Sequence, residues 1–177
     1  MIHPLRTSVD SRARTEACLM DCLVALTWLL ALSGVALGLR SLGLSGLNAT
    51  QDELTVDAIT LVVGLGPVAA YLILCETGQL QASWGKRRVG LRVVRADGSR
   101  AGLPRLVLRT VVKLLPWYLA HWGLSRLWLN FVPAQWATTC LAAVYLLVPI
   151  TIGLALVHPQ RRALHDWLAG TKVITAD

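Results

Sequence analysis

Charged residues are scarce in this sequence. Asp, Glu, Lys and Arg make up 15% of the 177 residues, 55% are apolar, and the mean hydropathy is +0.57. Soluble domains carry about 25% charged residues. The composition therefore excludes a disordered chain and predicts a membrane protein, because disorder requires low hydrophobicity and high net charge. The length suits one domain, which we place at residues 1–177, with no room for a large soluble catalytic module.

Cysteine and histidine are also sparse, with four residues of each. The cysteines lack the spacing of a zinc site or a disulfide framework, so we expect small apolar side chains there. The histidines have no metal-ligand spacing, and no nucleophile stands beside a base. We therefore expect no enzyme activity, no catalytic residue, no metal and no cofactor. The residues concerned are Cys18, Cys22, Cys75, Cys140, His3, His121, His158 and His165.

The sequence contains several long apolar runs that carry little or no charge. A membrane span needs about 20 mostly apolar residues, because the hydrocarbon core is about 30 Å thick. Three runs meet this length clearly, at about residues 19–39, 57–75 and 134–157. A fourth span is predicted at about 106–124. The predicted fold is an all-α membrane protein, a four-helix transmembrane bundle with a small cytoplasmic β element.

The fourth predicted span carries charge in its first half. Arg105, Arg109 and Lys113 follow one another every four residues and so share one side of a helix. Long basic side chains of this kind occur on interfacial helices or on spans where they reach the headgroups. They could equally pair with acidic groups on neighbouring helices inside the membrane. The sequence leaves both interpretations open.

The net charge of +7 is unevenly distributed, with seven of the 17 basic residues between positions 86 and 105. Lys and Arg favour the cytoplasmic side of a membrane. Four spans with both termini in the cytoplasm satisfy this rule, and we expect the chain in a cell (inner) membrane. The same residues could contact anionic lipid headgroups. We expect no nucleic-acid partner, since no binding motif accompanies the basic charge.

Two short segments alternate apolar and polar residues as half-buried strands do. They lie at 89–94, before the turn signal Asp97-Gly98, and at 171–175. We predict that they pair as a very small sheet on the cytoplasmic face. Such a sheet would attach the C-terminal tail to the central loop.

A few ionisable residues stand at the ends of the predicted spans, where burial is costly and a partner is expected. Three motifs surround them in order: Arg14-x-x-Ala17-x-x-x-Asp21, Gly85-Lys86-x-x-x-Gly90-Leu91-Arg92-Val93-Val94, and Leu164-His165-Asp166-x-x-Ala169-Gly170-Thr171. Together they resemble the RDD family of small multi-pass, mostly bacterial membrane proteins. The resemblance covers about residues 12–175 and implies that the Arg and the two Asp that name the family are Arg14, Asp21 and Asp166. Ser83 departs from the pattern, since a threonine is common there.

Two functions fit these candidate residues. In the first, the protein transports a small solute or exchanges cations for protons, and Asp21 binds the cation or proton. In the second, it is a non-transporting scaffold or accessory subunit, and Arg14, Asp21 and Asp166 form a structural ion network. Such a network adds specificity more than stability. The protein could act as a homo-oligomer or with a membrane protein partner. The secondary candidates are Glu76, Lys86, Arg109 and Lys113.

Overall fold

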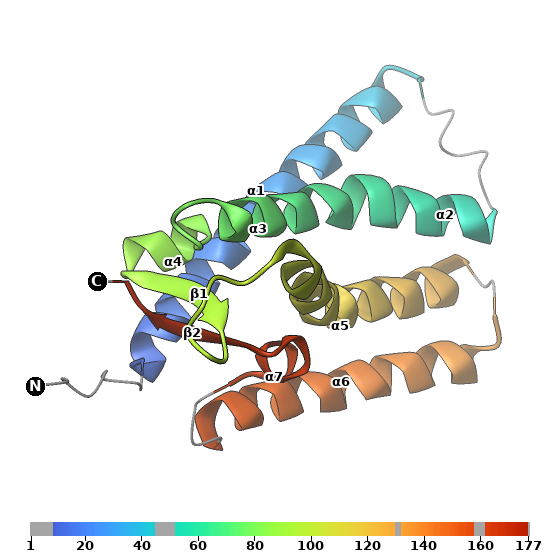
Figure 1. Ribbon diagram of the computed structural model, residues 1–177. Helices are drawn as coiled ribbons and strands as arrows, with labels where there is room; N and C mark the ends of the chain where they lie inside the picture. Colours follow the sequence, from blue (N-terminus) through green and yellow to red (C-terminus); the bar gives the residue numbers. More distant parts are fainter. Residues whose placement is uncertain (1–8, 45–51, 130–131, 158–161, 177) are drawn as a thin grey trace, which may run out of the picture.

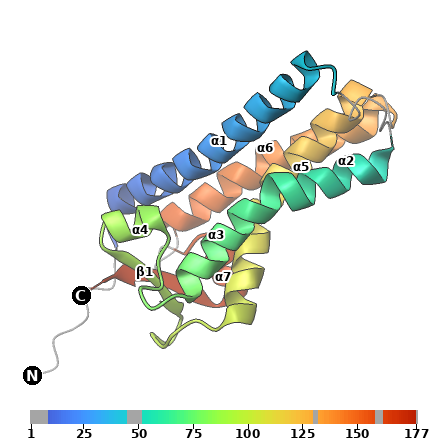
Figure 2. The same cartoon turned by 90° about the horizontal axis from the view of Figure 1, so that it is seen from above.

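The computed structural model describes residues 9–44, 52–129, 132–157 and 162–176, and side chains through Leu154 in the third of these ranges. The long helical segments run side by side, and the two strands and two short helices gather at one end of them (Figures 1 and 2). We call this the sheet end of the bundle. The prediction of a mostly helical membrane protein with a small β element is confirmed.

Three helical segments are long and apolar enough to span a membrane. They are Ser11–Ser41, Glu53–Thr77 and Ala134–Leu154, with mean hydropathies of 2.2, 2.2 and 2.0. The first is helix α1 (Ser11–Ser41), and the last belongs to α6 (Ala134–Val157). The middle one is continuous through α2 (Glu53–Ile59), η2 (Thr60–Leu65) and α3 (Gly66–Thr77). Their apolar side chains are mostly exposed, as expected of surfaces that meet lipid.

The middle span contains a wider, π-helical segment, η2, just before a proline. Pro67 has no N–H, so it cannot make the regular helical hydrogen bond to the carbonyl of Val63. The indole Nε1–H of Trp28 on α1 donates to this carbonyl at 3.0 Å. A side chain of one span thus compensates for the proline of its neighbour.

Helix α5 (Leu103–Leu129) contains the predicted fourth span and changes direction near its middle (Figures 1 and 2). Pro116 lies inside the helix, and a proline there removes a hydrogen bond and bends the axis. The half before it carries Arg105, Arg109 and Lys113, and α5 as a whole packs against α3, α6 and α7. That α5 crosses the membrane, as a four-span bundle requires, stays a prediction.

The sheet end contains strands β1 (Leu91–Arg95) and β2 (Thr171–Thr175), which pair antiparallel with Leu91 opposite Thr175. Helix α4 (Trp84–Arg88) precedes β1, and helix α7 (Leu164–Ala169) precedes β2. Gly170 has a φ of +63° at the end of α7, a left-handed conformation that turns the chain directly into β2. The predicted pairing of the central loop with the C-terminal tail is confirmed, and both ends of the described chain lie at the sheet end (Figure 1).

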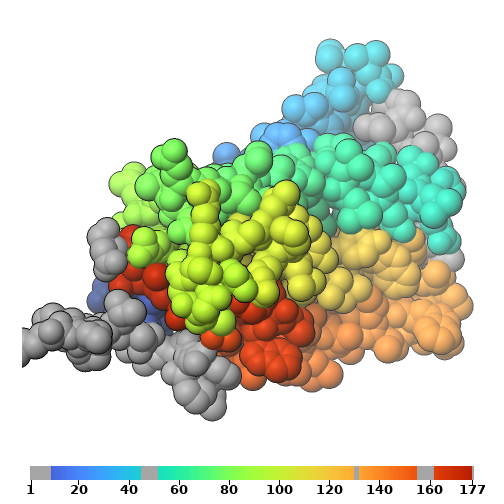
Figure 3. Space-filling model, in the orientation of Figure 1, coloured from blue at the N-terminus to red at the C-terminus, as the bar shows by residue number. Residues whose placement is uncertain are grey.

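A small apolar core lies beneath this sheet. It joins α1, the two strands and the start of α5, and Figure 3 shows the yellow-green and red residues of this end packed against each other. The buried core residues are Val9, Ala17, Leu91, Val93, Ala101, Leu106 and Val173. The helices outside the sheet end bury few side chains, so this core provides much of the apolar packing within the chain.

The core supplies a first testable prediction. Leu106 is 0% exposed, whereas Leu108 on the same helix is 46% exposed. Leu106→Ala leaves a cavity under the sheet and should lower the free energy of unfolding by about 2–5 kcal/mol. Leu108→Ala is the control and should change it by well under 1 kcal/mol. Thermal or denaturant unfolding in detergent measures both, and equal stability of the two variants would contradict this description of the core.

Candidate functional site

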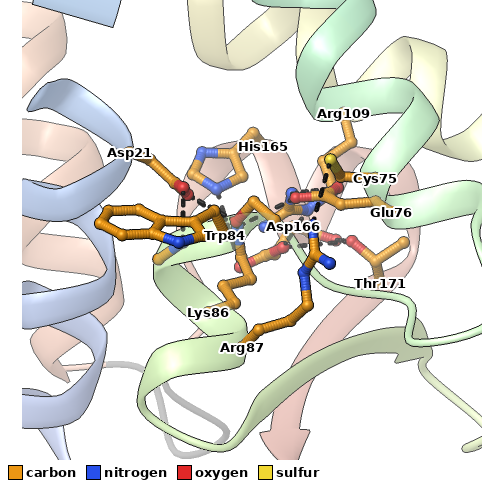
Figure 4. A network of polar contacts seen from close by, with 12 residues as sticks. Asp21, Cys75, Glu76, Trp84, Lys86, Arg87, Arg109, His165, Asp166 and Thr171 are labelled. Atoms are coloured by element: carbon orange, nitrogen blue, oxygen red, sulfur yellow. Dashed lines mark hydrogen bonds and ion pairs between the residues drawn. The ribbon is translucent and has the colours of Figure 1, made fainter. Parts of the chain in front are cut away.

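Five buried ionisable residues from five different helices meet at the sheet end (Figure 4). Each is at most 6% exposed. They are Asp21 on α1, Glu76 on α3, Lys86 on α4, Arg109 on α5 and Asp166 on α7. Burial of a single charge is costly, so each requires opposite charge and hydrogen-bond donors nearby.

Asp21 has four hydrogen-bond donors around its carboxylate. The Ser83 hydroxyl donates to Oδ2 at 2.6 Å, and the Lys86 ammonium lies 3.5 Å from the same oxygen. The Tyr71 hydroxyl and the backbone N–H of Gly85 both donate to Oδ1 at 3.1 Å. The carboxylate of α1 is therefore fixed to α3 and to the start of α4.

The close approach of α4 to α1 requires a glycine. A Cβ atom at Gly85 would lie 2.3 Å from the carbonyl oxygen of Ala17 and 3.0 Å from Oδ1 of Asp21. The first distance is far shorter than a van der Waals contact and involves backbone that cannot rotate away, and the second is very tight. The two residues of the Gly-Lys pair thus have different roles. Gly85 allows α1 to approach α4 closely, and Lys86 places a positive charge beside Asp21.

The remaining ion pairs form a chain in which the sign of charge alternates. Lys86 Nζ lies 2.9 Å from Oε1 of Glu76. Nη1 of Arg109 donates to both carboxylate oxygens of Glu76, at 2.8 and 2.7 Å. Nε of Arg109 donates to Oδ1 of Asp166 at 2.8 Å. The order Asp21, Lys86, Glu76, Arg109, Asp166 places every acid beside a base.

Asp166 is further held by the Thr171 hydroxyl, which donates to Oδ1 at 3.2 Å and so connects α7 to β2. Burial would raise the pKa of Asp166, but the adjacent Arg109 guanidinium outweighs it and lowers the pKa. Next to it, burial lowers the pKa of His165 to about 3, and Arg109 adds to this effect against the opposing charge of Asp166. The imidazole is therefore neutral near pH 7.

Arg14 contacts this assembly from its edge. Its Nη2 donates to the carbonyl oxygen of Val173 at 3.1 Å, which ties α1 to β2. The side chains that meet Asp21 and Asp166 within ion-pair distance include Lys86 and Arg109, two secondary candidates. The sequence alone does not favour this pairing, because Lys86 and Arg109 are far in the chain from the carboxylates that they meet.

A cavity of about 390 Å³ lies against the network. One wall is a face of α1 that includes Arg14 and Asp21, and the opposite wall comes from α6 and α7. Lys113 of α5 also lines the cavity and is partly buried. Across the parts of the chain that the structure describes, no carboxylate lies within 4.0 Å of its ammonium group. Arg14, Asp21 and Asp166, the three principal candidates of the sequence analysis, all line this cavity.

The sequence assigns no role to three polar side chains of the site. Tyr71, Ser83 and Thr171 each donate a hydrogen bond to a carboxylate. Thr171 ends the third motif and Ser83 stands two residues before Gly85, whereas Tyr71 has no local signal.

Sequence reasoning missed a second ion cluster at the other end of the bundle. There Arg126 lies 2.7 Å from Asp57 and packs over the Trp122 ring at 5.1 Å. Nearby, the Thr60 hydroxyl and Nε2 of His121 are 2.7 Å apart. These contacts join α2 and η2 to α5 far from the network.

Potential metal ligands do not gather anywhere in residues 9–44, 52–129, 132–157 and 162–176: no group of three or more His, Cys, Asp or Glu side chains could hold an ion there. The four cysteines are free thiols. His165 and Asp166, the adjacent pair that resembles an acid and a base, are 3.8 Å apart at Nε2 and Oδ2.

Comparison with known proteins identifies one family. The model of the RDD family matches residues 10–170, which is nearly the whole chain. No curated protein and no solved structure matches the chain.

The network predicts a large effect of removing its central cation. Arg109→Gln leaves Glu76 and Asp166 without their closest counter-ion and should cost about 3–5 kcal/mol of stability. The control is Arg12→Gln, which breaks an exposed pair with Glu16 and should cost about 0.5 kcal/mol or less. Thermal unfolding in detergent compares the two variants. An Arg109→Gln variant that unfolds at the same temperature as the wild type would refute a structural role for the ion pairs of Arg109 with Glu76 and Asp166.

The neutral state of His165 predicts a loss of stability in acid. Its pKa is near 6.5 when unfolded and about 3 when folded, so the unfolded state binds a proton first as the pH falls. Stability should be complete above pH 6.5 and decline from there toward pH 3, by on the order of 2 kcal/mol between pH 7 and pH 5. Asp166 contributes little in that range, because its lowered pKa acts only below about pH 4–5.

The measurement is the dependence of the unfolding midpoint on pH between 7.5 and 5. His165→Asn should flatten this dependence, whatever its stability at neutral pH. The same slope in the variant and the wild type would show that another group titrates.

Proposed function

Since the chain belongs to the RDD family and has helices of membrane-spanning length and apolarity, it is a multi-pass membrane protein, and we propose that it carries a small polar solute across the membrane. One observation supports this proposal above all: the cavity of about 390 Å³ lined by ionisable side chains. Charged residues inside membrane bundles commonly mark solute or ion pathways. The volume also suits a small molecule, since ligand pockets measure about 300–1,000 Å³.

In this proposal the ion-pair network holds the walls of the cavity in place, and the solute binds in the cavity. Asp21, Arg109 and Asp166 each use their charge to hold two or more helices together, and each also presents a surface to the cavity. Movement of α1 relative to α5 and α7 would open or close the cavity. A proton or cation could drive that movement by competing with Lys86 for Asp21.

A second candidate function is that of a non-transporting scaffold or accessory subunit. The observation that favours it is the saturation of the carboxylates: Asp21 has four donors, and Glu76 has two cations. Carboxylates held so completely are typical of a structural network. In this role the exposed apolar faces of the spans would contact a second copy or a membrane protein partner.

We also propose an orientation. Basic residues are concentrated at the sheet end, where Arg87 and Arg88 lie on α4, Arg92 and Arg95 on β1, and Lys172 on β2. By the positive-inside rule this end faces the cytoplasm, so both termini are cytoplasmic and the basic surface meets the anionic headgroups of the inner membrane.

Transport can be tested with the purified protein in proteoliposomes. Gradients of Na⁺, of H⁺ and of inorganic phosphate are imposed separately, and flux is compared with protein-free vesicles. We expect protein-dependent flux of at least one of these, reduced at least tenfold by Asp21→Asn. Asp97→Asn removes an exposed carboxylate and should leave the flux unchanged.

An unfolding curve of each variant separates loss of transport from loss of fold. Flux that survives equally in both variants would reject the role of Asp21. The absence of any protein-dependent flux, with folded protein in the vesicles, would contradict transport and favour the scaffold.

A further inference from the structure

Two cavities meet at the same pair of side chains. The first is the cavity of about 390 Å³ at the sheet end. The second, of about 110 Å³, lies between α1, the middle span and α5, and its lining is mostly apolar, with residues such as Leu29, Leu65 and Trp117. Asp21 and Lys113 line both of them. Asp21 and Lys113 therefore lie at the boundary between the larger cavity, which is lined by several charged side chains, and the smaller, mostly apolar one.

The lining of the larger cavity holds more basic than acidic side chains. Its cations are Arg14, Lys86, Arg109 and Lys113, and its carboxylates are Asp21 and Asp166. Neutral His165, which also lines the cavity, adds no charge.

The distances to the carboxylates single out Lys113 among the lysine and arginine side chains of α4 and α5 in this lining. Lys86 contacts Asp21 and Glu76, and Arg109 contacts Glu76 and Asp166. Lys113 has no carboxylate within 4.0 Å anywhere in the described chain, although it lies close enough to Asp21 and Glu76 to feel their charge. An ammonium group in a largely apolar surrounding needs a counter-ion, and here the adjacent cavity is where that counter-ion can sit.

We infer that the larger cavity binds an oxyanion, a phosphate or carboxylate group, and that the Lys113 ammonium is its principal counter-ion. Arg14 on the α1 wall provides a second positive charge, and the imidazole of His165 can donate one hydrogen bond. The inference deepens the proposed function by naming the class of its solute, and it rests on that proposal in treating the cavity as the solute site. The oxyanion could belong to a free small molecule or to the headgroup of an anionic phospholipid, and the experiment separates these sources.

Binding is measured without a gradient, by thermal unfolding of the full chain in neutral detergent. Inorganic phosphate and acetate are titrated against chloride at constant ionic strength. A ligand that binds the folded state alone raises the unfolding midpoint in a saturable way. We expect such a rise with phosphate or acetate, at least tenfold weaker in Lys113→Gln. Lys172→Gln on β2 is the matched control, because it removes a lysine outside the cavity and should behave as the wild type does.

A second arm tests the lipid source. The protein is placed in nanodiscs of phosphatidylcholine alone or with added phosphatidylglycerol. If the oxyanion is a headgroup, phosphatidylglycerol should stabilise the wild type more than Lys113→Gln, and the free anions should have little effect. The control in this arm is Arg40→Gln in the last turn of α1, outside the cavity and the basic surface, which should behave as the wild type does. Lys113→Arg keeps the charge and should retain binding, which guards against a Lys113→Gln variant that simply folds poorly.

The results overturn the inference in two ways. One is stabilisation of equal size in Lys113→Gln and the wild type; the other is no saturable stabilisation by phosphate, acetate or phosphatidylglycerol. Failure of transport is a different result. Lys113-dependent binding without flux would refute the proposed transport and keep the oxyanion site, whereas flux without Lys113-dependent binding would refute the site alone.

Discussion

The contact between Arg109 and its two carboxylates is the interaction on which the rest of the structure depends. One guanidinium reaches Glu76 on α3 and Asp166 on α7, and thereby connects three helices at the sheet end. In a soluble protein a large apolar core holds the helices together. Here most apolar side chains of the spans are exposed, as for contact with lipid, so directional ion pairs add to the small apolar core beneath the sheet.

Much of the fold could be predicted from the sequence because its physical signals are local. The three strong spans are continuous apolar runs, and the strands alternate from residue to residue. The π-helical segment and its partner could not be predicted, because the Trp28 bond to the Val63 carbonyl joins residues from two different spans. The bend in α5 was not predicted either, although Pro116 lies within the apolar run of this helix.

The candidate site was predicted in composition but not in pairing. Five of the ionisable residues that the sequence singles out converge in the structure, and they could be singled out because charge in an apolar chain is conspicuous. The sequence cannot say that Lys86 and Arg109 supply the nearest cations, since that depends on how five helices converge. Nor can it show that His165 is neutral, because its protonation follows from burial and from the guanidinium beside it. Tyr71 carries no local signal at all, and the motif positions of Ser83 and Thr171 do not show which carboxylate each one contacts.

The pairing of Leu91 with Thr175 has a consequence for biosynthesis. Synthesis proceeds from the N-terminus, so Asp21, Glu76, Lys86 and Arg109 all leave the ribosome before Asp166 and β2 exist. Until Asp166 and β2 have been synthesised, Arg109 lacks one of its two acids and β1 lacks its partner strand. A nascent chain at that stage therefore exposes an unbalanced charge and an unpaired strand, and the network and the sheet are completed together.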